Sequence, residues 1–315
     1  MRIKILLLIS LLVFLAGCNQ VTTETVAPAD PISQAPVVIE PTQMVAPSKT
    51  PRPTITLEPT ATTVPPIGLP HYTNPAPVGI NIQTPDGITL RGYFYPAAQK
   101  NAPVVVMMHQ FGGDQTLWHM ENSGFIAWLQ NWPTADGSIP TPSADGQLAA
   151  INPALTFNVL TFDFRGHGES DGERSEDLSI YLVDARAAYE TARTLPNVDP
   201  ERIVGIGTSI GADAVVNACD QDYCRGAFAI SPGNWLDIDF AESASAMISQ
   251  GKPVRCMYAD KDEPSPTTCW SLVRGEKYKI FGYPGIKHGM TFFTPRKMEE
   301  NFGKNIIEFL FEATQ

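Results

Sequence analysis

Short apolar runs alternate with longer helix-like segments from residue 103 to residue 312, and this order constrains the fold more than any other feature. The run Val104–Met108 contains no polar residue, which is typical of a parallel strand covered on both faces. A parallel strand needs a crossover that returns the chain to the same edge of the sheet, and the helix-like segments supply it. We therefore predict an α/β fold with a doubly wound, mostly parallel sheet.

The expected elements follow this pattern along the chain. The expected strands are Pro103–His109, Asn158–Phe164, Arg202–Gly207, Gly226–Ser231, Val254–Tyr258 and Tyr278–Gly282. The expected helices are Leu117–Gln130, Leu178–Leu195, Ile210–Ala218 and Arg296–Glu312, with about one more between Ser231 and Val254. Ahead of them, Gly79–Thr84 and Thr89–Tyr95 flank Pro85-Asp86-Gly87 and predict an antiparallel hairpin. The segment Trp132–Pro153 is rich in Gly, Pro and Asp and predicts a long loop.

The first residues have the features of an export signal. Arg2 and Lys4 precede the apolar run Ile5–Ala16, which is too short to span a bilayer comfortably. The sequence Leu15-Ala16-Gly17-Cys18 resembles the bacterial lipobox, which implies removal of residues 1–17 and acylation of Cys18. The resemblance thus implies an extracytoplasmic protein anchored by lipid to a bacterial membrane. An ordinary signal peptide followed by a chance cysteine is the alternative.

The composition then divides the chain at about residue 75. Residues 18–75 are rich in proline and threonine and poor in aromatic residues, so they bury too little apolar surface to offset the entropy of ordering. We predict an extended, disordered tether there, semi-rigid because of its prolines. Residues 76–315 have the usual size of one α/β domain.

Charge and cysteine content restrict the partners. A net charge of −11 without a basic face argues against nucleic acid, and we expect no cofactor. Four cysteines follow Cys18, and an even number in an exported chain favours disulfides: they are Cys219, Cys224, Cys256 and Cys269. The most local of the three possible pairings is Cys219–Cys224 with Cys256–Cys269. Free buried thiols are one alternative, and a metal site is a weaker one because the spacings match no Cys-x-x-Cys pair.

A candidate nucleophile lies where the expected strand Arg202–Gly207 meets the next helix. The sequence there is Gly207-Thr208-Ser209-Ile210-Gly211, and a sharp strand-to-helix turn needs small residues on both sides of its central serine. A Gly-x-Ser-x-Gly match alone is weak because glycine-rich turns are common. The strand before it and the helix after it supply the context that the motif requires, and they indicate Ser209 as a nucleophile.

A serine nucleophile needs a base and an acid that orients the base. Of five histidines, only His288 follows Ser209, in a loop between the last expected strand and the last helix. Asp260 and Asp262 both follow the expected strand Val254–Tyr258, so the residues alone leave the choice of acid open.

Together these motifs resemble the α/β-hydrolase superfamily, from about Gly79 to the C-terminus. The chain looks most similar to small serine hydrolases without a large cap domain, including esterases like dienelactone hydrolase. Those enzymes often use a cysteine nucleophile where this chain has serine, so their activity is not carried over. The resemblance implies the order serine, acid, histidine, which fits Ser209, Asp262 and His288. It favours Asp262 over Asp260 as the acid.

The resemblance also implies an oxyanion hole made of two backbone N–H groups. They would belong to Ile210, after the nucleophile, and to Phe111, in the loop after the strand Pro103–His109. Many relatives have His-Gly at the start of that loop, and Gln110 departs from the pattern. His109 is interpreted as structural, as are Arg165 and His167 in the turn Asp163–Ser170.

The implied reaction is a two-step acyl transfer that cleaves a small-molecule carboxylic ester. Phe111, Trp235 and Met290 are candidates to line an acyl pocket, or are ordinary packing residues. Peptide or amide hydrolysis by the same triad is one alternative. An inactive, lipid-tethered binding module is another, and a missing triad member would favour it. The sequence indicates neither the substrate nor the oligomeric state.

Overall fold

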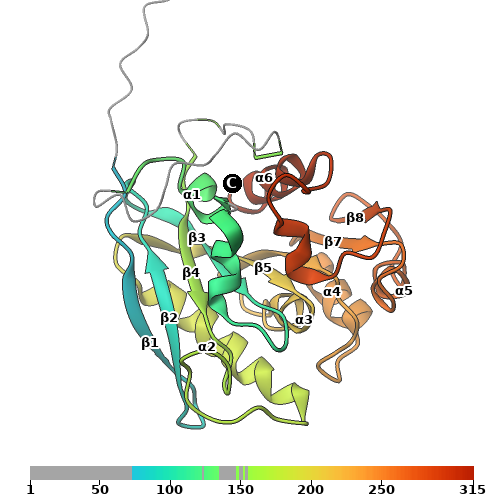
Figure 1. Cartoon of the computed structure of the whole chain (residues 1–315), viewed down its shortest axis with the longest axis horizontal. Helices are drawn as coiled ribbons and strands as arrows, with labels where there is room; N and C mark the ends of the chain where they lie inside the picture. Colours follow the sequence, from blue (N-terminus) through green and yellow to red (C-terminus); the bar gives the residue numbers. More distant parts are fainter. Residues whose placement is uncertain (1–72, 123, 135–146, 149–151, 153–154) are drawn as a thin grey trace, which may run out of the picture. The chain divides into compact units, whose positions relative to one another are not determined.

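In the part of the chain that the structure describes, eight strands form one sheet, and most of their pairings are parallel. In chain order they are β1 (Val78–Gln83), β2 (Thr89–Tyr95), β3 (Ala102–Met108), β4 (Asn158–Phe162), β5 (Val198–Thr208), β6 (Cys224–Ile230), β7 (Val254–Ala259) and β8 (Tyr278–Tyr283). The order across the sheet is β1-β2-β4-β3-β5-β6-β7-β8 (Figure 1). Strands β3 to β8 pair in parallel, whereas β1 and β2 join antiparallel at one edge. The predicted fold class is confirmed.

The computed structural model describes residues 73–315 apart from 123, 135–146, 149–151 and 153–154. The predicted signal peptide 1–17, the lipidation site Cys18 and the tether up to residue 72 lie outside the described residues, as does much of the predicted loop Trp132–Pro153. Within the described part of the chain, no helix is both long enough and apolar enough to cross a membrane.

Helices connect the strands and cover both faces of the sheet (Figure 1). The α-helices are α1 (Phe125–Gln130), α2 (Tyr181–Thr194), α3 (Ile210–Asn217), α4 (Phe240–Ser249), α5 (Ser265–Cys269) and α6 (Phe302–Ala313). The described residues also form the 3-10 helices η1 (Gln115–Asn122), η2 (Leu178–Ile180) and η3 (Gly289–Phe293). A single helix, α4, lies between β6 and β7, as expected.

The alternating side chains of β3 enter two separate apolar cores. Val104 and Met108 pack in one core with residues of α2, α3 and α4. Val105 and Met107 pack in the other core with residues of α1 and α6. Successive side chains of a strand point to opposite faces, so an uninterrupted apolar run is stable only where both faces are covered. This is the physical basis of the pattern in Val104–Met108.

The predicted hairpin is present, with Gln83 opposite Thr89 in the register of β1 and β2. The prediction of one helix over Leu117–Gln130 is wrong, because η1 and α1 are separated at Gly124, which has a φ of 68°. A left-handed residue interrupts the hydrogen bonds of a right-handed helix. The last helix also begins later than predicted, at Phe302, because Asn301 has a φ of 63°.

Both disulfides of the most local pairing are present. Cys219 is bonded to Cys224, just after α3, and Cys256 in β7 is bonded to Cys269 in α5. All four cysteines are buried. The second disulfide closes a loop of the chain that contains Asp262.

The packed structure includes residues that precede the predicted boundary at 75. Asn74 is fully buried, its Nδ2 donates to Trp132 O at 2.6 Å, and its Oδ1 accepts from Ala98 N at 2.8 Å. A buried side-chain amide is stable only when such partners are present. Asn74 thus packs with the domain, although it lies in the stretch for which we predicted a tether.

Candidate active site

Strand β5 runs directly into helix α3, and Ser209 is the single residue between them. Ser209 has a φ of 54° and a ψ of −118°, a conformation that residues with a Cβ rarely adopt. Its N–H donates to Ile230 O at the end of β6, at 2.9 Å. A strained strand-to-helix turn of this kind is typical of a nucleophile elbow, in which the serine hydroxyl stands above the carboxyl edge of the sheet.

The glycines on either side of this turn are required by close backbone contacts. A Cβ at Gly207 would lie 2.0 Å from Gly211 O, and a Cβ at Gly211 would lie 2.2 Å from Met108 O in β3. Neither position has room for a side chain. The Gly-x-Ser-x-Gly spacing therefore follows from how tightly β5, α3 and β3 approach one another.

The imidazole of His288 is held by Asp262. His288 Nδ1 lies 2.8 Å from Asp262 Oδ1, and the Asp262 side chain is only 8% exposed. A carboxylate accepts from Nδ1–H, so this contact favours the tautomer whose Nε2 is free to accept a proton. Asp260 has a different partner, because its Oδ1 accepts from Gly285 N at 2.7 Å. Of the two carboxylates, Asp262 is the one that contacts the histidine.

The loop that carries His288 contacts the turn that carries Ser209. A Cβ at Gly289 would lie 3.5 Å from Thr208 Cβ, so the residue after the histidine lies close to the residue before the serine. The N–H of Gly289 also donates to Ser231 Oγ at 3.0 Å, and Ser231 directly follows β6. Loops that follow β5, β6, β7 and β8 thus gather at the carboxyl edge of the sheet, where ligands bind in open α/β folds.

The two predicted oxyanion donors lie at this same edge. Ile210 is the first residue of α3, and an N–H at that position has no acceptor within the helix. Phe111 lies in a turn after β3 that is closed by Gly113 N donating to Gln110 O at 3.2 Å. Phe111 is 43% exposed, so it borders solvent at the site.

His109 supports the Phe111 turn from inside the protein. Phe164 N donates to His109 Nε2 at 3.1 Å, so Nδ1 carries the proton and donates to Gln110 O at 2.8 Å. The ring is fully buried, and burial lowers the pKa of His109 to about 4. A neutral histidine with both nitrogens occupied acts as a structural residue, in agreement with its interpretation from sequence.

His167 supports the same turn from its other side. Gly112 N donates to His167 Nε2 at 3.3 Å, and Nδ1 donates to Arg165 O at 2.9 Å. Burial lowers the pKa of His167, which favours this neutral form. The Phe111 turn is thus held by two neutral histidines from two different loops.

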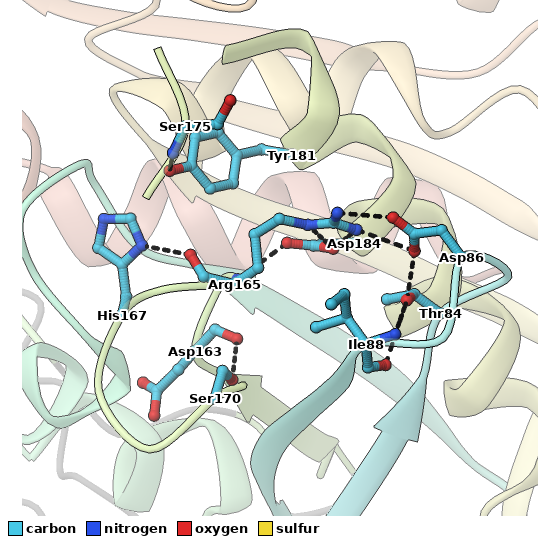
Figure 2. A network of polar contacts seen from close by, with 10 residues as sticks. All are labelled: Thr84, Asp86, Ile88, Asp163, Arg165, His167, Ser170, Ser175, Tyr181 and Asp184. Atoms are coloured by element: carbon cyan, nitrogen blue, oxygen red, sulfur yellow. Dashed lines mark hydrogen bonds and ion pairs between the residues drawn. The ribbon is translucent and has the colours of Figure 1, made fainter. Parts of the chain in front are cut away.

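The turn Asp163–Ser170, which contains His167, is stabilised by a polar network (Figure 2). Ser170 Oγ donates to Asp163 O at 2.6 Å. Arg165 forms ion pairs with Asp184 at 2.7 Å and with Asp86 at 2.6 Å, which join this turn to α2 and to the β1–β2 hairpin. Arg165 and Asp184 are both buried, and a buried ion pair of this kind fixes geometry at the cost of desolvation.

Gln110, which departs from the His-Gly pattern, joins two loops of the site. Its Oε1 accepts from Met290 N at 2.9 Å. A Cβ at Gly289 would lie 2.4 Å from the same oxygen, so the amide packs directly against the backbone beside His288. A glycine at position 110 has no atoms with which to make this contact.

The three candidate pocket residues have different surroundings. Met290 is 2% exposed and packs in the core with α1 and α6, so it is a packing residue. Trp235 is partly buried, and its ring lies 6.2 Å from the His288 ring at 84°. Phe111 is exposed, as described above. Sequence reasoning missed the contacts Gln110–Met290 and Ser231–Gly289. The unusual residue at position 110 is a signal that could have indicated the first of them.

Parts of the chain are similar to known proteins. Residues 149–258, which include Ser209, match the family model described as serine aminopeptidase, S33. An uncharacterised protein of Mycobacterium tuberculosis is 31% identical over 147 residues, which cover 47% of this chain and 42% of that protein. The quorum-quenching protein AidA of Acinetobacter baumannii is 27% identical over 150 residues, or 47% of this chain and 40% of AidA. The chain thus spans less than half the length of these relatives.

Solved structures share the fold at low sequence identity. The Pyrococcus furiosus esterase Pf2001 has a TM-score of 0.56 and 18% identity, covering 76% of this chain and 93% of that structure. Est1E from Butyrivibrio proteoclasticus, solved with ferulic acid bound, has a TM-score of 0.52 and 18% identity, covering 74% of this chain and 98% of that structure. Together with the strand order, these structures show that the chain has the α/β-hydrolase fold.

Proposed function

We propose that this protein is a serine hydrolase that cleaves carboxylic esters of small molecules through Ser209, His288 and Asp262. The observation that carries the proposal is the 2.8 Å contact between His288 Nδ1 and Asp262 Oδ1, on loops that converge on the Ser209 turn. A buried carboxylate that orients a histidine next to a strained serine is the arrangement that acyl transfer requires.

In the proposed reaction, Ser209 Oγ attacks the ester carbonyl carbon while His288 Nε2 takes the hydroxyl proton. The carbonyl oxygen becomes an oxyanion that accepts hydrogen bonds from the N–H groups of Phe111 and Ile210. His288 then gives its proton to the leaving alkoxide, and the C–O bond of the ester breaks. Water attacks the acyl-serine by the same steps and releases the acid. Asp262 stabilises the imidazolium in both halves without accepting its proton.

The N-terminal sequence supports an extracytoplasmic location. We propose that the chain is exported, that Cys18 is acylated, and that residues after it tether the hydrolase to a bacterial membrane. Cys18→Ser is expected to abolish incorporation of labelled fatty acid and to release the protein from the membrane fraction. Unchanged incorporation in this variant would rule out Cys18 as the lipidation site.

A second candidate substrate class is supported by one specific observation. The family model that matches residues 149–258 is described as serine aminopeptidase. The same triad cleaves esters and amides, so the choice depends on how the site treats an amine leaving group.

The experiment compares both classes with one enzyme preparation. The full chain, purified in mild detergent, is assayed with p-nitrophenyl acetate and butyrate and with aminoacyl p-nitroanilides. We expect the wild type to hydrolyse the esters and Ser209→Ala to lose this activity. The matched control is Ser245→Ala, which changes an exposed serine on α4 and should keep the wild-type activity. Faster turnover of the anilides would favour the peptidase alternative. No turnover of either class would leave the inactive binding module as the better account.

A further inference from the structure

The loop between β6 and α4 has a strained backbone and lies beside His288. Residues 231–237, called here the 231–237 loop, include three residues other than glycine with positive φ: Ser231 at 57°, Asn234 at 56° and Asp237 at 53°. Each such residue is strained, and a conformation of this kind persists only where surrounding contacts stabilise it. The loop therefore needs a strong anchor.

That anchor is the carboxylate of Asp213, in the first turn of α3. Asp213 is fully buried, its Oδ1 accepts from Gly233 N at 3.2 Å, and its Oδ2 accepts from Trp235 N. Burial raises the pKa of Asp213 to about 7, while hydrogen bonds from the backbone of the 231–237 loop act in the opposite direction. Above that pH the group is an anion that only accepts hydrogen bonds, which suits a loop that presents several N–H groups to it.

The anchored loop supports His288 in two ways. The Trp235 ring lies 6.2 Å from the His288 ring at 84°, and its Nε1 donates to Ser231 O at 3.3 Å, so the indole is tied to its own loop. Ser231 Oγ accepts from Gly289 N at 3.0 Å and thus holds the residue after the histidine. One side chain of the loop contacts the imidazole, and another fixes the adjoining backbone.

Asp213 also belongs to the helix that begins at the nucleophile. It lies one helical turn after Ser209, whose O accepts from Asp213 N at 3.3 Å. The carboxylate therefore connects the serine turn to the loop that supports the histidine. A displacement of that loop would change the placement of His288 relative to Ser209.

We propose that Asp213 is a positioning residue for His288, on which it acts through the 231–237 loop and chiefly through the Trp235 side chain. The inference rests on the proposed function, because it assigns His288 the role of base. Its physical basis is that catalysis by proton transfer depends steeply on geometry, and a misplacement of about 1 Å can cost about 100-fold in rate.

The first test is Asp213→Asn in the full chain, assayed with p-nitrophenyl butyrate at pH 8. The amide has one acceptor oxygen, and its NH2 group would face backbone N–H donors. We expect kcat to fall at least about tenfold and KM to change by less than about threefold, since only the placement of the base is altered. Asp220→Asn makes the same chemical change at an exposed site after α3 and is expected to leave both constants unchanged.

A double-mutant cycle with Trp235→Ala then identifies the route. If Asp213 acts through Trp235, the double variant should lie within about threefold of the more impaired single variant, because the losses share one cause. The proposal is overturned if the factor by which kcat falls in the double variant equals the product of the factors in the two single variants. It is also overturned if a folded Asp213→Asn protein has a kcat within twofold of the wild type. If Asp213→Asn does not fold, Trp235→Ala decides: an unchanged kcat overturns the proposal, and a tenfold loss with an unchanged unfolding midpoint supports it. An inactive wild-type protein would instead refute the proposed function.

Discussion

Asp262, and not its neighbour Asp260, contacts His288: the Oδ1 atom of Asp262 lies 2.8 Å from His288 Nδ1. Asp260 instead accepts from Gly285 N, which joins the loop after β7 to the loop after β8. The two aspartates thus differ both in their contacts and in burial, because Asp262 is buried and Asp260 is exposed. An acid that orients the histidine and an acid that stabilises a loop respond differently to the same substitution.

We predict that Asp262→Asn lowers kcat by about 10³–10⁴, because an amide at this position favours the wrong tautomer of His288. Asp260→Asn should stay within about threefold of the wild type. The measurement is steady-state hydrolysis of p-nitrophenyl butyrate by both variants, with circular dichroism as the check on folding. Equal losses in the two variants would contradict the assignment of Asp262.

Replacement of Gln110 tests the contact between the Phe111 turn and the His288 loop. Gln110→Met keeps the length of the side chain but removes the oxygen that accepts from Met290 N. We expect kcat to fall about tenfold with KM nearly unchanged, because the loops that carry the proposed oxyanion donor Phe111 and the proposed base His288 lose their common support. Gln250→Met, at the exposed end of α4, is the matched control and should have no effect. A Gln110→Met enzyme with wild-type kcat would show that the contact is dispensable.

The buried His109 predicts a specific dependence of stability on pH. Burial lowers the pKa of His109 from 6.5 to about 4. Between pH 4 and pH 6.5, His109 is therefore protonated in the unfolded chain but neutral in the folded chain. The stabilisation is complete above pH 6.5, and about 3 kcal/mol of it is lost as the pH falls from 6.5 to 4.

This prediction is checked by urea unfolding at several pH values between 4.5 and 7.5. His109→Gln is less stable at neutral pH, but its free energy of unfolding should depend less steeply on pH over that interval, by the titration of one group. Parallel curves for the two proteins would mean that His109 does not carry the effect.

The disulfide Cys256–Cys269 closes a loop that contains Asp262, so its removal should affect both stability and activity. The bonded residues are 13 apart, and the lost constraint on the unfolded chain corresponds to about 3 kcal/mol. The double variant Cys256→Ser/Cys269→Ser should therefore unfold at a lower temperature and also lose kcat, because Asp262 is held less firmly.

The other disulfide is a matched control. Cys219 and Cys224 are 5 apart, which corresponds to about 2 kcal/mol, and they lie after α3 and at the start of β6, away from His288. Replacing both with serine should lower stability while the remaining folded enzyme keeps its kcat. If the two double variants lose stability but have the same kcat, the disulfide Cys256–Cys269 does not help to hold Asp262.

Much of the fold, and several of the residues that meet at the carboxyl edge of the sheet, could be predicted because they depend on local patterns. An apolar run such as Val104–Met108 indicates a strand that is buried on both faces. The glycines Gly207 and Gly211 indicate the tight turn around Ser209. His288 could be named because it is the only histidine after the serine. The apolar run and the glycines follow from packing within a few residues of the chain, and His288 follows from the lack of another histidine after Ser209.

The remaining features depend on contacts between distant segments. The break between η1 and α1 follows from the left-handed conformation of Gly124, which a helical pattern does not reveal. Gln110 meets Met290 across 180 positions, and Asp213 meets the backbone of the 231–237 loop about 20 positions away. Almost every residue has a backbone N–H group, so the partner of such a side chain can be of any type and cannot be recognised in the sequence. These contacts could therefore be found only from the structure.

Covalent labelling tests most directly whether Ser209 is an activated nucleophile. The full chain is treated with a fluorophosphonate, digested, and analysed by mass spectrometry to locate the adduct. We predict one adduct, on Ser209, that is absent from Ser209→Ala and forms far more slowly in His288→Ala. No adduct on the folded wild-type protein, or an adduct on another residue, would contradict the assignment.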